Sequence, residues 1–216
     1  MKLEGLKINF LGDSITEAAG TSDPKYVFWR QLGERTGAVC RGYGIGGTRI
    51  AKQTTPSSVA RYDRYFASRI DEMDPDADVI VVFGGTNDYG HGDAPLGTMA
   101  DRTPDTFTGA CHDLITRLEE KYPAKPIVIC TPIHRKGESE IHVKVGTQPT
   151  VLQTYVDIIK EVAAYYGCPV LDLFRVSGIQ PDIPSQAELL TKDGLHPNDL
   201  GNSLICDRLA GFLGAL

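Results

Sequence analysis

Short runs rich in β-branched residues alternate with helical patterns five times along this chain of 216 residues. The clearest run is residues 78–83, Asp-Val-Ile-Val-Val-Phe, a nearly continuous apolar stretch typical of a strand buried on both faces of a parallel sheet. The expected strands are residues 7–12, 38–43, 78–83, 126–130 and 169–173. This alternation predicts an α/β fold, a three-layer α/β/α sandwich around a five-stranded parallel sheet.

The segments between these strands carry helix signals. Glycine stands where two of the patterns stop, at Gly37 and Gly167, and proline stands where two begin, at Pro104 and Pro197. The expected helices are residues 27–35, 57–73, 103–122, 149–166 and a last one from 197. The expected long loops are residues 84–102, 132–147 and 174–191. No linker or repeat divides the chain, so residues 1–216 are predicted to form one domain.

Composition excludes several classes of function. With 28 Asp and Glu against 22 Lys and Arg, the net charge is −6 and no basic stripe stands out, so nucleic acid is not an expected partner. Nothing approaches the ~20 apolar residues that span a bilayer, and an acidic surface would repel an anionic membrane. The five cysteines form no CxxC pair, and residues 1–7 lack the apolar core of a secretory signal. We therefore expect a reduced, cytoplasmic protein without a metal or other cofactor, and its oligomeric state stays open.

The first candidate catalytic residue is Ser14, which follows the first expected strand in the segment Gly12-Asp13-Ser14. Ligands of open α/β sheets bind beyond the carboxyl ends of the strands. A tight turn at this point exposes a serine hydroxyl for nucleophilic attack, and a helix beginning after it would direct N–H groups at developing negative charge. The segment also suits a helix N-cap, because Ser14 and Glu17 have capping-box spacing. Taken alone, the tripeptide favours the cap.

Two glycine-containing segments follow the second and third expected strands. Residues 42–48 match the GxGxxG dinucleotide fingerprint, but after the second strand instead of the first, and Asp63 lies in a helical pattern. A loop whose N–H groups approach a substrate oxygen fits better, although a flexible turn fits equally well. Residues 84–88 include Asn87, which can offer an amide donor at the sheet edge; a plain turn is equally compatible.

Asp193 and His196 stand three residues apart in the turn before the last expected helix. A carboxylate near one imidazole nitrogen fixes the tautomer, so that the other nitrogen can accept a proton from a serine. Four other histidines compete for this role: His91, His112, His134 and His142. The one in an expected helix, His112, is interpreted as structural. The three on expected loops lack an Asp-x-x-His arrangement and are interpreted as pocket-lining or surface residues.

In their order and spacing, these segments resemble the SGNH (GDSL-type) hydrolase family, which is named for Ser, Gly, Asn and His in successive blocks. The corresponding segments here are residues 12–16, 44–48, 85–88 and 193–197. The resemblance extends from residue 8 to about 197 and implies a flavodoxin-like SGNH hydrolase fold. Thr48 stands where the family often has Asp, which leaves open whether Gly46 or Gly47 is the glycine of the second block; we prefer Gly47.

The resemblance also implies a serine esterase that acts on a small-molecule ester through an acyl-enzyme. It makes Ser14 the nucleophile, His196 its base and Asp193 the residue that orients the base. The N–H groups of Ser14 and Gly47 and the side-chain amide of Asn87 would form the oxyanion hole.

The acyl and alcohol pockets are expected in the loops at residues 89–93, 131–147 and 174–191, which are polar and contain no long apolar run. Short acyl esters, such as acetylated carbohydrates, are therefore favoured over lysophospholipids or thioesters. A binding protein that has lost catalysis on the same fold is the other alternative. The chain lacks the Gly-x-Ser-x-Gly elbow of α/β-hydrolases and a phosphate-binding Gly-x₄-Gly-Lys-Ser/Thr segment.

Overall fold

Five parallel strands form the centre of the computed structural model, which describes residues 1–142 and 149–216. The strands are β1 (Lys7–Gly12), β2 (Val39–Gly44), β3 (Val79–Phe83), β4 (Ile127–Cys130) and β5 (Val170–Leu171). Their order in the sheet, β2-β1-β3-β4-β5, is that of flavodoxin-like folds, in which the connections change direction between the first and third strands. The predicted five-stranded parallel sheet is confirmed.

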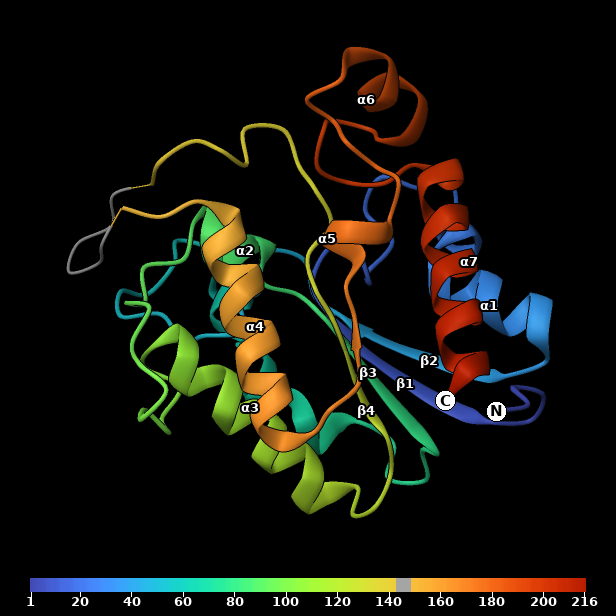
Figure 1. Ribbon diagram of the computed structural model, residues 1–216, viewed down its shortest axis with the longest axis horizontal. Coiled ribbons are helices and arrows are strands. Elements are labelled where there is room, and N and C mark those ends of the chain that lie inside the picture. Colours follow the sequence, from blue (N-terminus) through green and yellow to red (C-terminus); the bar gives the residue numbers. More distant parts are fainter. Residues whose placement is uncertain (143–148) are drawn as a thin grey trace.

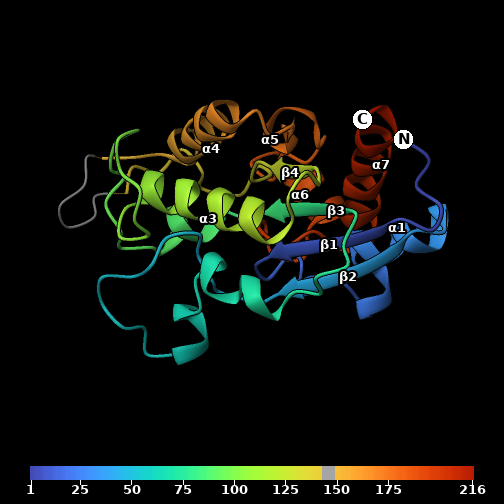
Figure 2. The same ribbon diagram turned by 90° about the horizontal axis from the view of Figure 1, so that it is seen from below.

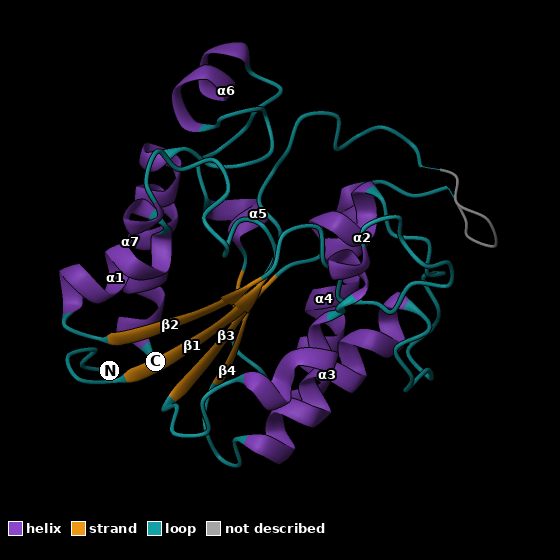
Figure 3. Cartoon of the chain, turned by 180° about the vertical axis from the view of Figure 1, so that it is seen from behind, coloured by secondary structure: helices purple, strands orange, loops and turns teal. Residues whose placement is uncertain are grey.

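Helices cover both faces of this sheet, as Figures 1 and 3 show. One face carries α1 (Phe28–Thr36) and α7 (Asp199–Ala215), and the other carries α3 (Phe107–Lys121) and α4 (Leu152–Tyr166). Successive residues of a strand point to opposite faces. On β3, Val79 and Val81 therefore join the core under α1 and α7, whereas Ile80 and Val82 join the core under α3 and α4. These two cores account for the predicted three layers.

The two chain ends lie close together at one edge of this arrangement (Figure 2). The N-terminal amine of Met1 donates a hydrogen bond of 2.6 Å to the carbonyl of Gly214, near the end of α7. The five cysteines are free, and four of them are buried. In the described ranges, no helix combines the length and apolar character that crossing a bilayer would require.

The prediction of one helix over residues 57–73 is wrong. The segment instead forms two 3₁₀ helices, η2 (Ala60–Asp63) and η3 (Phe66–Glu72), separated by extended backbone at Tyr65. The side chains of Phe66 and Arg69, three residues apart, are both buried, which suits the three-residue repeat of a 3₁₀ helix. The Asp63 carboxylate binds the N–H and hydroxyl of Ser57, which draws the chain into a turn before η2.

Several other boundaries differ from the prediction because side chains cap the helices at later positions. Thr106, not Thr103, caps α3 by accepting from the N–H of Gly109. Asn198 caps α7, one residue after Pro197. Within the expected loops and strand ends, the structure adds η1 (Pro24–Tyr26), α2 (Thr86–Gly90), α5 (Leu173–Val176) and α6 (Pro184–Leu190). Residues 143–148, which include the end of the expected loop 132–147, lie outside the described residues.

The helix ends predicted at two glycines are confirmed. Gly37 and Gly167 take left-handed φ values of 75° and 70° directly after α1 and α4. Glycine reaches this conformation without the cost that a Cβ atom imposes.

Candidate active site

Ser14 lies in a tight turn directly after β1, as predicted. Gly12 permits this turn, because a Cβ atom at that position would lie 2.0 Å from the Thr16 hydroxyl and 2.9 Å from the Phe83 carbonyl. The residues after Ser14 form a series of turns, such as the one closed by the hydrogen bond of 2.9 Å from the Glu17 N–H to the Asp13 carbonyl, and not a regular helix. The Ser14 hydroxyl does not cap this segment; it lies 3.0 Å from Nε2 of His196.

His196 and Asp193 lie in the turn before α7. His196 contacts Ser14, which lies 182 residues earlier in the chain. Nδ1 of His196 lies 2.7 Å from Oδ2 of Asp193, and Oδ1 of the same carboxylate accepts the N–H groups of Leu195 and His196. Burial raises the pKa of Asp193, but these hydrogen bonds outweigh burial and hold its pKa below the ordinary value. An ionised Asp193 keeps the proton on Nδ1, so Nε2 can accept the proton of Ser14.

The glycine loop after β2 supplies two N–H groups near Ser14, and they differ in what they already bind. The N–H of Gly46 donates to Oε2 of Glu17 at 2.7 Å. Within residues 1–142 and 149–216, the N–H groups of Ser14 and Gly47 donate to no protein acceptor. Gly47 has φ of 76°, and a Cβ atom there would lie 2.4 Å from the Tyr62 ring. The geometry therefore favours Gly47 over Gly46 as an oxyanion donor.

Asn87 lies in the first turn of α2, after β3, and its side chain is 5% exposed. Its Nδ2 donates to the carbonyl of Thr48 at 2.9 Å, and its Oδ1 lies 3.2 Å from Nε2 of His91. The neighbouring carboxylate of Asp88 accepts the N–H groups of Ile50 and Ala51. Asn87 and Asp88 together tie the turn after β3 to the loop after β2.

Ser14, His196 and Asn87 line one pocket of about 560 Å³. Its lining consists of Ser14, Glu17, Ala19, Gly46, Gly47, Arg61, Tyr62, Asn87, Gly90, His91, Arg135, Leu195 and His196. Of the loops expected to build the pocket, 89–93 and 131–147 contribute Gly90, His91 and Arg135. The expectation for residues 174–191 is wrong for this pocket: none of them lines it, because part of this loop folds into α6, which projects from the body of the molecule (Figure 1).

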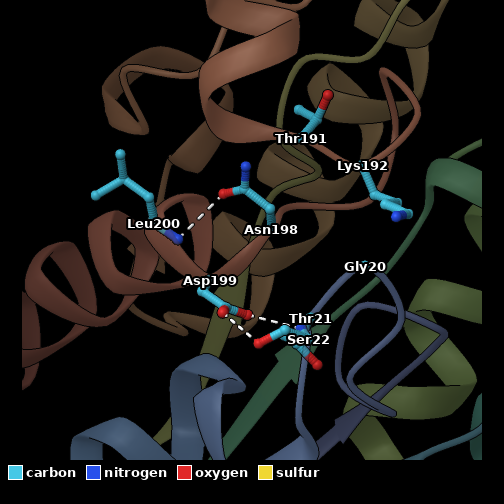
Figure 4. Close-up of a pocket in the computed structure, with 8 residues that line it drawn as sticks. All are labelled: Gly20, Thr21, Ser22, Thr191, Lys192, Asn198, Asp199 and Leu200. Carbon is cyan, nitrogen blue, oxygen red and sulfur yellow. Dashed lines mark hydrogen bonds between the residues drawn. The ribbon is translucent and has the colours of Figure 1, made fainter.

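A second hollow of equal volume lies beside the start of α7 (Figure 4). It is lined by Gly20, Thr21, Ser22, Thr191, Lys192, Asn198, Asp199 and Leu200. The carboxylate of Asp199 binds the N–H and hydroxyl of Ser22 across it, at 2.8 and 2.5 Å. This hollow holds neither Ser14 nor His196. Since volume does not separate the two cavities, the chemistry of the lining identifies the candidate site.

Sequence reasoning missed the partner of His91. The interpretation of His91 as a pocket-lining residue agrees with the structure, but its contact with Asn87 was not expected. The four-residue spacing between them was the available signal, since a helix over residues 86–90 places positions four apart on one face. Arg49, which lies 3.0 Å from Nδ1 of His91, was missed as well. In the described part of the chain, no cluster of three His, Cys, Asp or Glu side chains could hold a metal ion.

Asp13 is a buried carboxyl group directly before the candidate nucleophile. Burial raises its pKa to about 6, although the N–H of Ile15 and the nearby His196 oppose the shift. The proton is therefore bound more tightly in the folded than in the unfolded chain. The cost of ionising Asp13 grows as pH rises from about 4 to about 6 and stays constant above that, and it amounts to about 3 kcal/mol for two pKa units.

We expect Asp13→Asn to remove this cost, because an amide oxygen can still accept from Ile15. The stability gained over the wild type should be small at pH 4 and reach up to about 3 kcal/mol at pH 7.5. Urea unfolding of both proteins at the two pH values measures the difference. A difference that does not change with pH would contradict the assignment of the raised pKa to Asp13.

Comparison with known proteins identifies the family to which the chain belongs. The model of the GDSL-like Lipase/Acylhydrolase family matches residues 10–204, which is most of the chain. The chain therefore belongs to this family of hydrolases, and it shares their α/β fold. No curated protein matches it in sequence.

Solved structures extend the comparison. A protein from Lactobacillus plantarum is 32% identical, with a TM-score of 0.83 and 98% of each chain covered. An acetyl xylan esterase is 25% identical, with a TM-score of 0.65, covering 95% of this chain and 98% of its own. A member of the lipolytic protein G-D-S-L family from Veillonella parvula is 16% identical, with a TM-score of 0.67, covering 98% of this chain and 100% of its own. At that identity, the last one supports the fold alone.

Proposed function

We propose that this protein is a serine esterase that hydrolyses short-chain carboxylic esters through an acyl-enzyme on Ser14. The observation that carries the proposal is the continuous contact from Ser14 Oγ to His196 Nε2 at 3.0 Å and from His196 Nδ1 to Asp193 Oδ2 at 2.7 Å. A nucleophile, a base within hydrogen-bond reach and a third group that orients the base are the parts that nucleophilic catalysis requires.

In the proposed reaction, Ser14 Oγ attacks the ester carbonyl carbon while Nε2 of His196 takes the hydroxyl proton. The carbonyl oxygen becomes an oxyanion, which accepts from the N–H groups of Ser14 and Gly47 and from the amide of Asn87. As the tetrahedral intermediate collapses, His196 gives its proton to the leaving alcohol. A water molecule then gives a proton to His196 and attacks the acyl carbon, and a second collapse releases the acid and restores Ser14.

Two observations support a short acyl group, acetyl above all. The side chains around Ser14 are mostly polar or charged and include Glu17, Arg61 and Arg135, which offers a fatty chain little apolar surface. Arg61 donates to Glu17 at 2.5 Å, so part of this wall is an ion pair. In addition, the acetyl xylan esterase at 25% identity acts on acetyl esters of a carbohydrate, which supports acetylated carbohydrates as the alcohol side of the substrate.

A panel of p-nitrophenyl esters tests the proposal. We expect kcat/KM to be highest for acetate and to fall with octanoate and palmitate, because the polar pocket gains little from burying additional methylene groups. Acetylated xylan oligosaccharides should also release acetate. A preference for palmitate or for acyl thioesters would replace the acetyl-ester proposal with a lipase or thioesterase. No turnover of any ester would leave a binding protein on the same fold.

A further inference from the structure

The carboxamide of Asn87 is in contact with the Thr48 carbonyl on one side and with the His91 ring on the other. Each contact restricts how the carboxamide is oriented. The contact with the Thr48 carbonyl at 2.9 Å requires a donor, so it identifies the nitrogen. That bond uses one of two amide hydrogens, and the second is left for a ligand. The opposite end of the carboxamide, Oδ1, needs a donor to face it. Nε2 of His91 occupies that position at 3.2 Å.

The other ring nitrogen of His91 determines whether Nε2 can donate. Nδ1 lies 3.0 Å from a guanidinium nitrogen of Arg49. A guanidinium has only donors, and therefore Nδ1 must accept and carries no proton. A neutral imidazole in this state carries its proton on Nε2, facing the oxygen of Asn87. Arg49 thus selects the tautomer that the carboxamide of Asn87 needs.

Arg49 is in turn fixed in place. Its side chain is 3% exposed, and it forms a 3.0 Å ion pair with the Asp63 carboxylate. The same guanidinium donates to the Ser57 hydroxyl at 2.9 Å and to the Tyr62 carbonyl at 3.1 Å. These acceptors lie in the segment that was expected to be one helix, so its breakdown into turns and 3₁₀ helices places them around Arg49.

We propose that His91 is a positioning residue for the proposed esterase reaction: held in its Nε2–H tautomer by Arg49, it orients the Asn87 carboxamide so that the amide nitrogen faces the oxyanion. The proposal rests on the proposed function. Without the Nε2–H donor, Thr48 is the one hydrogen-bond partner that the carboxamide keeps among residues 1–142 and 149–216. Its oxygen then turns toward the pocket in part of the molecules, where it repels the developing negative charge.

A double-mutant cycle tests this role. We expect His91→Ala to lower kcat for p-nitrophenyl acetate by about five- to tenfold, with KM changed less than about twofold, because one orienting hydrogen bond is lost. In an Asn87→Ala background, the same substitution should change nothing. His91→Gln, whose amide can donate to Asn87, should restore most of the rate. His134→Gln is the control, because His134 contacts Glu138 and does not line the pocket. Its kcat and KM should match those of the wild type.

Equal losses from His91→Ala in both backgrounds, or a change confined to KM, would overturn the proposal, because His91 would then contact the substrate directly. An inactive wild type would contradict the proposed function instead, and a second measurement covers that case. Nitrogen-15 NMR of the histidine rings at pH 8, assigned with His91→Gln, reports the tautomer without any turnover. We expect the proton of His91 on Nε2; a proton on Nδ1 would overturn the proposal.

Discussion

Ser14→Ala should reduce ester hydrolysis to background, a loss on the order of 10⁶-fold in kcat if the triad acts as a unit. Alanine removes only the hydroxyl that contacts His196 at 3.0 Å, so no acyl-enzyme can form while the fold stays intact. Initial rates with a fluorogenic acetate, alongside thermal unfolding of both proteins, measure the effect. Ser22→Ala is the matched control, since Ser22 binds Asp199 in the other hollow and should leave the rate unchanged.

If Ser14→Ala kept more than a small fraction of the wild-type rate after repurification, Ser14 would not be the nucleophile. The same loss in Ser22→Ala would point to an indirect effect on the turn between β1 and α1.

Asn87→Ala should lower kcat by about 10²–10³-fold, the usual cost of one oxyanion donor, with a much smaller change in KM. The reason is that the amide meets negative charge only as the tetrahedral intermediate forms. Asn87→Asp is the sharper variant: it keeps an oxygen toward His91 but offers no amide donor, so its rate should fall at least as far. Steady-state kinetics on both proteins, with folding checked by circular dichroism, provides the measurement.

Full activity in a folded Asn87→Ala protein would remove Asn87 from the oxyanion hole. Loss of folding in Asn87→Ala alone, with Asn87→Asp folded and active, would assign the side chain a structural role through its contact with His91, which aspartate keeps.

The sheet could be predicted from the sequence because its signals are local and strong. The strand β3, Val79–Phe83, is buried on both faces, and helix-ending glycines such as Gly37 mark where the chain turns back. In a parallel sheet, the segments after the strands must gather at one edge. That rule was sufficient to expect Ser14 and Asn87 near each other before any distance was known, whereas His196, which follows no strand directly, was assigned to the same site through the family resemblance.

The rest depends on contacts between distant residues, which no local pattern encodes. Residues 57–73 have the composition of a helix, but Asp63 and Arg49 bind each other across 14 residues and the chain takes turns instead. The capping interpretation of Ser14 failed for the same reason, because the partner of its hydroxyl lies 182 residues away. Short helices such as α6, with seven residues, gain too little from local propensity to stand out in a sequence.

In the proposed reaction, the hydroxyl of Ser14, activated by His196, is the group that becomes acylated. Labelling with a fluorophosphonate, followed by mass spectrometry of the digested protein, tests it most directly. One adduct on the wild-type protein, located on Ser14 and strongly reduced in His196→Ala, is the expected result. An adduct on another residue, or no adduct on a folded protein that hydrolyses esters, would contradict the claim.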